Sequence, residues 1–290
     1  MKLSPGKRFR NAVIEEHPLQ IPGVINAYVA LMAEQIGYSV LYLSGAGIAN
    51  SSYGLPDLAM TTLENVLEDA RRITAVTDLP LLVDIDTGFG NHLMIQRTIR
   101  EMIRAGVAGV HIEDQVFNKR CGHRDGKKLV STSEMTERIQ AAAEAKTEPD
   151  FVIMARTDAL AVEGLDAALE RSKAYRLAGA DMLFPEAITE VSQYQKFKDA
   201  SSLPILANMT EFGKTPLLHL DELANAGVDM ALYPLSANRA MNKAAYDLLQ
   251  DLRFNGTQAK SVDKMQTRDE LYKILQYEKF EKIFNEEGKK

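Results

Sequence analysis

The sequence predicts an α/β protein folded as one parallel (β/α)8 barrel of the TIM type, with an additional C-terminal helical segment. Two observations predict this fold: a repeated pattern of glycine followed by an apolar run, and the alternation of such runs with helical stretches. Strand–helix alternation with short connections gives a parallel sheet, and eight units in about 250 residues are typical of a closed barrel. An open, doubly wound sheet is the structural alternative.

The repeated pattern marks most of the predicted strands. Four segments carry it, each after a helical stretch: residues 36–44, 105–114, 178–186 and 226–234. Glycine suits the position just past a helix end, where the backbone turns left-handed before it enters a strand. Three further apolar runs begin at or next to a proline, residues 79–86, 149–157 and 203–210, and residues 19–26 form a weaker eighth. These runs are apolar on both faces, as strands buried beneath helices are.

Helical patterns lie between the runs, among them residues 63–77, 91–105, 133–146 and 165–178. We expect residues 1–250 to form the barrel and residues 251–290 to form a C-terminal helical extension outside it. The pattern of residues 271–284 is amphipathic. Its apolar face would pack on the barrel of the same subunit or on that of a neighbour.

Composition excludes several classes of protein. With 46% hydrophobic and 26% charged residues, the chain has the material for one large core. Its net charge of −6 argues against a nucleic-acid partner, because binding to phosphate backbones needs a cationic face. The N-terminus has no signal-peptide pattern, and no apolar run is long enough to cross a membrane. The single cysteine excludes an internal disulfide, so we expect a reduced, cytoplasmic protein that acts on a small molecule.

Polar residues follow the predicted strands, where the chemistry of such a barrel collects. They are Ser44, Asp84, Asp86, Glu113, Asp114, Arg156, Asp158, Glu186, Asn208 and Thr210. Capping of the following helices would explain the serine, aspartate and asparagine residues. It explains Glu113, Arg156 and Glu186 poorly, because these residue types are not favoured caps.

The Asp-Ile-Asp triplet at residues 84–86 is more specific. Residues two apart on a strand face the same side, so Asp84 and Asp86 would point together into the barrel mouth. Two carboxylates so close repel each other unless a cation lies between them or one is protonated. With Glu113 nearby and oxygen ligands only, the sequence favours a hard cation, Mg²⁺ or Mn²⁺. The alternative is a helix cap beside an arginine-paired aspartate.

The only cysteine, Cys121, lies in a glycine- and cation-rich stretch, residues 118–128. A lone cysteine is most often a small buried hydrophobe. The surrounding charges favour a surface loop instead, and cations together with His123 would lower the pKa of the thiol. The sequence therefore indicates a loop that closes on an anionic substrate and carries an acid/base thiol to the site.

Nine segments together resemble the isocitrate lyase and phosphoenolpyruvate mutase superfamily, and more narrowly its methylisocitrate lyase family. They are YLSGAG (42–47), VDIDTGFG (83–90), IEDQ (112–115), KRCGH (119–123), ARTDA (155–159), MLFPEA (182–187), ANMTEFGKTP (207–216), YPLSANRAMN (233–242) and MQTRDELY (265–272). The resemblance covers nearly the whole chain. It implies Mg²⁺-dependent retro-aldol cleavage of 2-methylisocitrate to pyruvate and succinate in the methylcitrate cycle of propionate catabolism.

The resemblance also implies roles for individual residues. Asp84 and Asp86 would hold the metal, with Glu113 acting through water, and Cys121 would protonate the leaving carbanion. Tyr42 and Asp57 are both candidates for the base. The substrate-binding residues that it implies are Ser44, Gly45, Ala46, Cys121, Gly122, His123, Arg156, Glu186, Asn208, Thr210, Arg239 and Arg268. It further implies a homotetramer with exchanged C-terminal helices.

Two positions depart from the family pattern. Many methylisocitrate lyases have glycine where this chain has Ala46, and they commonly have an aromatic residue where it has Asn238. The second change bears on the pocket for the substrate's methyl group. Isocitrate, 2,3-dimethylmalate and oxaloacetate are therefore alternative substrates. A catalytically silent, dicarboxylate-binding barrel is the alternative from another class, although a binder has no use for a proton-donating thiol.

Overall fold

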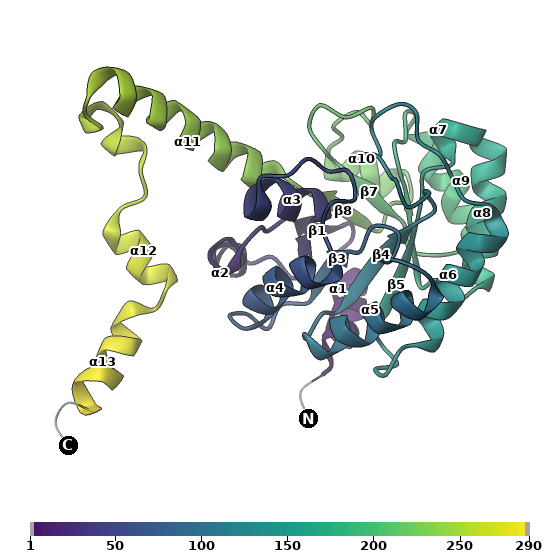
Figure 1. Ribbon diagram of the computed structural model, residues 1–290, viewed down its shortest axis with the longest axis horizontal. Helices are drawn as coiled ribbons and strands as arrows, with labels where there is room; N and C mark the ends of the chain where they lie inside the picture. Colours follow the sequence, from purple (N-terminus) through teal and green to yellow (C-terminus); the bar gives the residue numbers. More distant parts are fainter. Residues whose placement is uncertain (1–2, 288–290) are drawn as a thin grey trace.

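Eight parallel strands form a closed barrel in the computed structural model, which describes residues 3–287 (Figure 1). The strands are β1 (Leu19–Pro22), β2 (Leu41–Leu43), β3 (Leu81–Asp84), β4 (Gly109–Glu113), β5 (Val152–Thr157), β6 (Met182–Pro185), β7 (Leu206–Asn208) and β8 (Met230–Tyr233). Strands β2 to β6 pair in chain order, and β8 pairs with both β1 and β7. Bridges between Gly23 and Tyr42 and between Leu183 and Ile205 join the two sheets. The predicted barrel is confirmed, and the open sheet is wrong.

Helices cover the outside of the barrel. They are α2 (Ala27–Ile36), α3 (Gly45–Tyr53), α4 (Leu63–Thr74), α5 (His92–Arg104), α6 (Thr132–Glu144), α7 (Leu160–Glu163), α8 (Leu165–Leu177), α9 (Ser192–Ser201) and α10 (Leu220–Asn225). The four repeat glycines, Gly37, Gly106, Gly179 and Gly227, all have a positive φ, between 77° and 107°. They turn the chain from a helix toward the next strand, as the repeat predicts.

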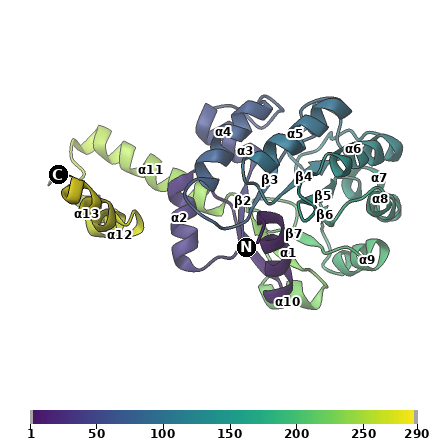
Figure 2. The same cartoon turned by 90° about the horizontal axis from the view of Figure 1, so that it is seen from below.

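The N-terminal helix α1 (Pro5–Glu15) lies across the end of the barrel where the strands begin (Figure 2). Its Phe9 is fully buried and joins Leu19, Ile21 and the other inward-facing residues of the strands in one apolar cluster. The Arg10 Nε donates to the carbonyl of Asp150, just before β5, at 2.9 Å. A larger apolar cluster fills the space between strands and helices. Helix α1 thus covers one end of the barrel and leaves the opposite end for the polar residues.

The C-terminal segment extends away from the barrel (Figure 1) and touches it again at α2, where the Tyr28 hydroxyl donates to the Gln266 side chain at 2.8 Å. It consists of α11 (Ser236–Asn255), the 3-10 helix η1 (Ala259–Lys264), α12 (Arg268–Ile274) and α13 (Tyr277–Glu287). The expected boundary at residue 250 falls inside α11, and residues 1–2 and 288–290 of the two expected segments lie outside the described residues. Large apolar side chains are exposed here, including Phe254, Phe280 and Phe284. In residues 3–287, no helix combines the length and the apolar composition that crossing a membrane would require.

Candidate active site

Polar side chains from six strands meet at the carboxyl end of the barrel. Asp84 ends β3, Glu113 ends β4 and Asn208 ends β7. Arg156 lies on β5 opposite Glu113 in the register of the sheet, while Ser44 and Glu186 directly follow β2 and β6. All six side chains are buried. Buried polar groups in such number need partners or a ligand, which makes this mouth the candidate active site.

Asp84 and Asp86 form the first half of the mouth. The expectation that one strand carries both is wrong, because β3 ends at Asp84 and Asp86 has a left-handed φ of 49°. The turn nevertheless brings the two together: Oδ1 of Asp84 accepts the backbone N–H of Asp86 at 3.0 Å, and Oδ2 accepts that of Gly45 at 3.1 Å. A side chain at Gly45 would begin only 3.1 Å from Asp84 Oδ2 and 3.4 Å from Asp86 Oδ1. Glycine at 45 therefore leaves room beside both carboxylates.

A buried ammonium balances this charge. The Nζ of Lys119 lies 2.6 Å from Asp57 Oδ1 and 2.6 Å from Asp86 Oδ1. Burial raises the pKa of Asp86 to about 6, although Lys119 acts in the opposite direction. Burial also acts to raise the pKa of Asp84, but His111 and Lys119 outweigh it and lower that pKa. The mouth thus already holds a cation where the sequence predicts one.

The oxygen atoms around Lys119 fit a hard divalent cation. Asp86 Oδ1 and Glu113 Oε2 are buried with only the ion-pair contacts of Lys119 and Arg156, and Glu113 Oε1 is buried without a partner. In residues 3–287, no cluster of three or more acidic, histidine or cysteine residues could form a complete cage. This suits Mg²⁺, which usually binds one or two carboxylates and takes its other ligands from water and substrate. The residues present could hold such an ion, with Asp84 and Asp86 as its protein ligands.

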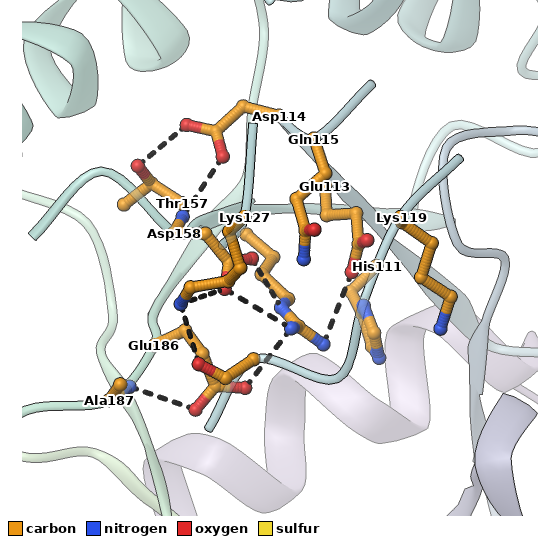
Figure 3. A network of polar contacts seen from close by, with 12 residues as sticks. His111, Glu113, Asp114, Gln115, Lys119, Lys127, Thr157, Asp158, Glu186 and Ala187 are labelled. Atoms are coloured by element: carbon orange, nitrogen blue, oxygen red, sulfur yellow. Dashed lines mark hydrogen bonds and ion pairs between the residues drawn. The ribbon is translucent and has the colours of Figure 1, made fainter. Parts of the chain in front are cut away.

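Arg156 links the metal half of the mouth to the second half. Its guanidinium contacts three carboxylates: Glu113 at 3.2 Å, Asp158 at 3.1 Å and Glu186 at 3.3 Å. Figure 3 shows these three carboxylates gathered at one point of the mouth. Burial acts to raise the pKa of Glu186, but Arg156 and His123 outweigh it, so that pKa lies far below its usual range. An anionic substrate could therefore exchange with protein carboxylates for the same guanidinium.

Tyr42 and His111 form a buried pair beside Asp84. The Tyr42 hydroxyl and His111 Nε2 share a hydrogen bond of 2.9 Å, and the two rings stack. Burial lowers the pKa of His111 to about 4 and raises that of Tyr42 well above its usual value. Both groups are therefore neutral near pH 7. Asp57, the other candidate base, reaches this part of the mouth through its ion pair with Lys119.

The loop that contains Cys121, residues 118–128 and here called the Cys121 loop, lies folded down on the mouth. A side chain at Gly122 would begin 2.4 Å from Glu186 Cγ and 2.5 Å from Arg156 Nη2, so the loop backbone lies directly against these two residues. The backbone N–H of Lys214 donates to His123 Nδ1 at 3.0 Å. His123 Nε2 therefore carries the ring proton and donates it to Glu186 at 3.0 Å. Cys121 is partly exposed between these contacts.

The remaining predicted residues lie at different depths. Ser44 caps α3, its hydroxyl accepting the Gly47 N–H at 3.2 Å, and Ala46 follows in the first turn of that helix. Thr210 is buried beside Asn208. Arg239 lies farther out, where it pairs with Glu211 at 3.4 Å.

Arg268 and Asn238 do not join the mouth in this chain. Arg268 is the first residue of α12, and within residues 3–287 no hydrogen bond or ion pair connects it to the other predicted residues. Asn238 is buried and accepts a hydrogen bond from Ser51 on α3 at 3.1 Å.

Several residues of the mouth were missed by sequence reasoning. His111 is hidden in the middle of β4, where its neighbours read as an ordinary apolar strand. Lys119 and Lys127 belong to a cation-rich stretch that indicated only a surface loop, yet both side chains are buried. No pattern in that stretch distinguishes the two buried lysines from the exposed ones. Their burial becomes visible only when the fold of the loop is known.

The fold and the mouth together define a barrel enzyme that acts on small anionic molecules. Residues 9–253 match the family model described as phosphoenolpyruvate phosphomutase. The chain is 61% identical over 279 residues to the 2-methylisocitrate lyase of Escherichia coli (strain K12), which covers 96% of this chain and 94% of that protein. The chain belongs to the phosphoenolpyruvate mutase and isocitrate lyase superfamily.

Solved structures of the superfamily have the same fold. An oxaloacetate acetylhydrolase structure superposes with a TM-score of 0.91 at 34% identity and covers 98% of this chain and 97% of its own. A phosphonopyruvate hydrolase, with a TM-score of 0.85 and 26% identity over 97% of this chain and 98% of its own, was solved with oxalate and Mg²⁺. Members of this superfamily thus bind Mg²⁺ together with a small dicarboxylate.

Proposed function

We propose that this protein cleaves 2-methylisocitrate to pyruvate and succinate in a Mg²⁺-dependent reaction, as part of propionate catabolism. One observation carries the proposal: the loop with the only thiol lies closed on Arg156 and Glu186, across from the paired carboxylates Asp84 and Asp86. A retro-aldol cleavage needs these two halves, one for the nascent carbonyl and one for the leaving carbanion. The identity of 61% to an enzyme named for this reaction supports the same substrate.

The oxo-acid half would lie at Asp84 and Asp86. These two carboxylates would hold the ion directly, and Glu113 would contact it through water. When bound, Mg²⁺ supplies a Lewis acid that stabilises negative charge on the substrate oxygen. The backbone from Ser44 to Ala46 and the guanidinium of Arg156 would orient the carboxylate of this half.

Tyr42 is the better placed of the two candidate bases. It lies inside the barrel, hydrogen-bonded to His111 beside Asp84, whereas the Asp57 carboxylate is already paired with Lys119. Tyr42 would take the proton of the substrate hydroxyl and pass its own phenolic proton to His111 Nε2, with which it shares a hydrogen bond. The O–H electrons then form the carbonyl of pyruvate as the carbon–carbon bond breaks, and the pair from that bond remains on the succinate carbon.

The succinate half would lie under the Cys121 loop. The thiol of Cys121 would donate its proton to the carbanion, and the thiolate would regain a proton from solvent after release. Seven residues would surround this half: Cys121, Gly122, His123, Glu186, Asn208, Thr210 and Arg239. A working thiol of this kind belongs in a reducing compartment such as the cytoplasm.

We also propose a homotetramer in which the C-terminal extension packs on a neighbouring subunit. The exposed apolar side chains of α11 and α13 support this assembly. Exchange of the extension would bring the Arg268 of a neighbouring copy toward the mouth.

A product assay tests the proposed reaction. The purified chain is incubated with Mg²⁺ and separately with 2-methylisocitrate, isocitrate, 2,3-dimethylmalate and oxaloacetate, and pyruvate, glyoxylate, oxalate and succinate are quantified. We expect pyruvate and succinate from 2-methylisocitrate at the highest kcat/KM, loss of activity with EDTA and its return with Mg²⁺. If another acid has the highest kcat/KM, that acid would replace 2-methylisocitrate as the proposed substrate. If none of the four acids is turned over, the result would favour a binding protein.

A further inference from the structure

Lys127 is a buried charge for which the proposed reaction has no use. It lies at the end of the Cys121 loop, and its side chain is only 2% exposed. Its Nζ donates to the carbonyl of Gly122 at 2.5 Å and to Asp158 Oδ1 at 2.7 Å. Burying an ammonium is costly unless it is paired and hydrogen-bonded, and here both conditions are met inside a loop whose other charges are mostly exposed.

Both partners of Lys127 belong to the mouth. Asp158 is fully buried and also accepts from Arg156 Nε at 3.1 Å. Gly122 follows Cys121 directly, and its backbone lies against Arg156 and Glu186. The Lys127 ammonium therefore links the carbonyl of Gly122, the residue after Cys121, to the carboxylate of Asp158. Figure 3 shows Lys127 beside Asp158.

A second charged contact of the loop is weaker. The Nζ of Lys214 lies 2.6 Å from Asp125, but the side chains of this pair are 39% and 94% exposed. Exposed ion pairs contribute little because water and salt screen them. After Cys121, the lysine contact of Lys127 is thus stronger than that of Lys214. Before Cys121, Lys119 holds the other side of the loop through Asp57 and Asp86.

We propose that Lys127 is a positioning residue: it holds the Cys121 loop on Arg156 and Asp158 and thereby sets where the thiol lies. The proposal rests on the proposed function in that Cys121 must lie above the substrate. Its first test needs no turnover, so the two can fail separately.

Alkylation of Cys121 tests the position of the loop, because no other cysteine is present in the 290 residues. The rate of modification by iodoacetamide is measured in the ligand-free enzyme from neutral to alkaline pH. The variants are Lys127→Met, Lys127→Arg and, as the matched control, Lys128→Met, which removes the same charge from an exposed neighbour. Melting curves establish that each variant is folded.

The alkylation rate at the alkaline plateau of the pH–rate profile reports how accessible the Cys121 thiol is. We expect it to rise about tenfold or more in Lys127→Met, because hydrogen bonds to a charged group hold the loop closed. It should also rise in Lys127→Arg, whose planar guanidinium does not replace a compact ammonium between two acceptors. The arginine variant retains the cation beside Asp158, so it supplies the test if the methionine variant does not fold. Lys128→Met should match the wild type.

A purely electrostatic role predicts a different profile. Loss of a nearby cation would raise the thiol pKa and move the midpoint to higher pH with an unchanged plateau. An unchanged plateau in both Lys127 variants, whether or not the midpoint moves, would overturn the proposal. In turnover with 2-methylisocitrate, misplacement of the thiol should lower kcat more than it changes KM, whereas a rise in KM alone would also contradict it.

Discussion

Cys121 lies between two residues that the barrel holds in place. On one side, the Gln115 side chain pairs with both the N–H and the carbonyl of Arg120, at 3.0 and 2.9 Å. On the other side, the Gly122 carbonyl accepts from Lys127. The single thiol thus projects from a backbone fixed at both neighbours. A proton donor needs this kind of restraint, because transfer requires hydrogen-bond distance to the accepting carbon.

We therefore expect Cys121→Ser to lose most of its turnover. The hydroxyl has nearly the same size but is a much weaker acid, so kcat should fall about 10²- to 10⁴-fold, the usual contribution of a general acid. KM should change little, because the loop contacts of Gly122 and His123 remain. Steady-state kinetics with 2-methylisocitrate measure both constants. A kcat within a few-fold of the wild type would remove the thiol from the reaction.

Glu186 links the charge of the mouth to the stability of the fold. Its pKa in the folded state lies far below its usual value, so its carboxylate stabilises the protein fully above the unfolded pKa of about 4.3. As pH falls below that value, the unfolded chain binds a proton first and this stability declines.

The difference in unfolding free energy between the wild type and Glu186→Gln should therefore be constant near neutral pH. It should shrink in acid by about 1.4 kcal/mol per pH unit. Urea unfolding of both proteins along a pH series measures it. A difference that stays constant through the acid range would show that Glu186 is not ionised more easily in the folded state.

At the scale of elements, α1 covers one end of the barrel interior. Phe9 is fully buried among strand residues, so Phe9→Ala should lower the free energy of unfolding by about 3 to 5 kcal/mol. Ile14 on the same helix is 80% exposed, and Ile14→Ala serves as the matched control with a change below about 0.5 kcal/mol. Denaturant unfolding measures both variants. Equal effects would mean that α1 does not close the barrel.

The strands and most helices could be predicted from the sequence pattern more readily than the contacts that close the ends of the barrel. Strands such as β3 and β5 were predictable because a buried parallel strand must be apolar on both faces, and their polar ends marked the mouth. Helix α1 was not, because its apolar face is completed by residues from strands far along the chain. Asp86 was placed on a strand because alternation cannot show a left-handed turn at that residue.

Contacts between distant loops were beyond any local pattern. The pairing of His123 with Glu186, and of Lys127 with Asp158, joins residues far apart in the chain. The residue types at the mouth could be predicted from the sequence, but their partners required the fold.

At the scale of the whole molecule, the C-terminal extension presents apolar side chains that the barrel does not cover. Phe280, Ile283 and Phe284 lie on α13 at helical spacing and are 65%, 50% and 76% exposed. Exposed patches of this kind mark protein interfaces. We expect the wild type to be larger in solution than one chain of 32.2 kDa.

The double variant Phe280→Glu/Phe284→Glu should shift the protein to smaller species, because burying two carboxylates opposes association. Light scattering coupled to size-exclusion chromatography measures the mass. Lys282→Glu, an exposed change on the same helix, is the control and should leave the mass unchanged. A monomeric wild type would contradict the proposed assembly.

The position of helix α1 affects how substrate enters the enzyme and how products leave it. A barrel that is covered where its strands begin opens at the other end, and the Cys121 loop covers that opening. Both products must leave by the route through which the substrate entered. In the proposed arrangement, the succinate beneath the loop would depart before the pyruvate held beside Asp84 and Asp86. We therefore expect ordered release, in which excess succinate would slow the departure of pyruvate.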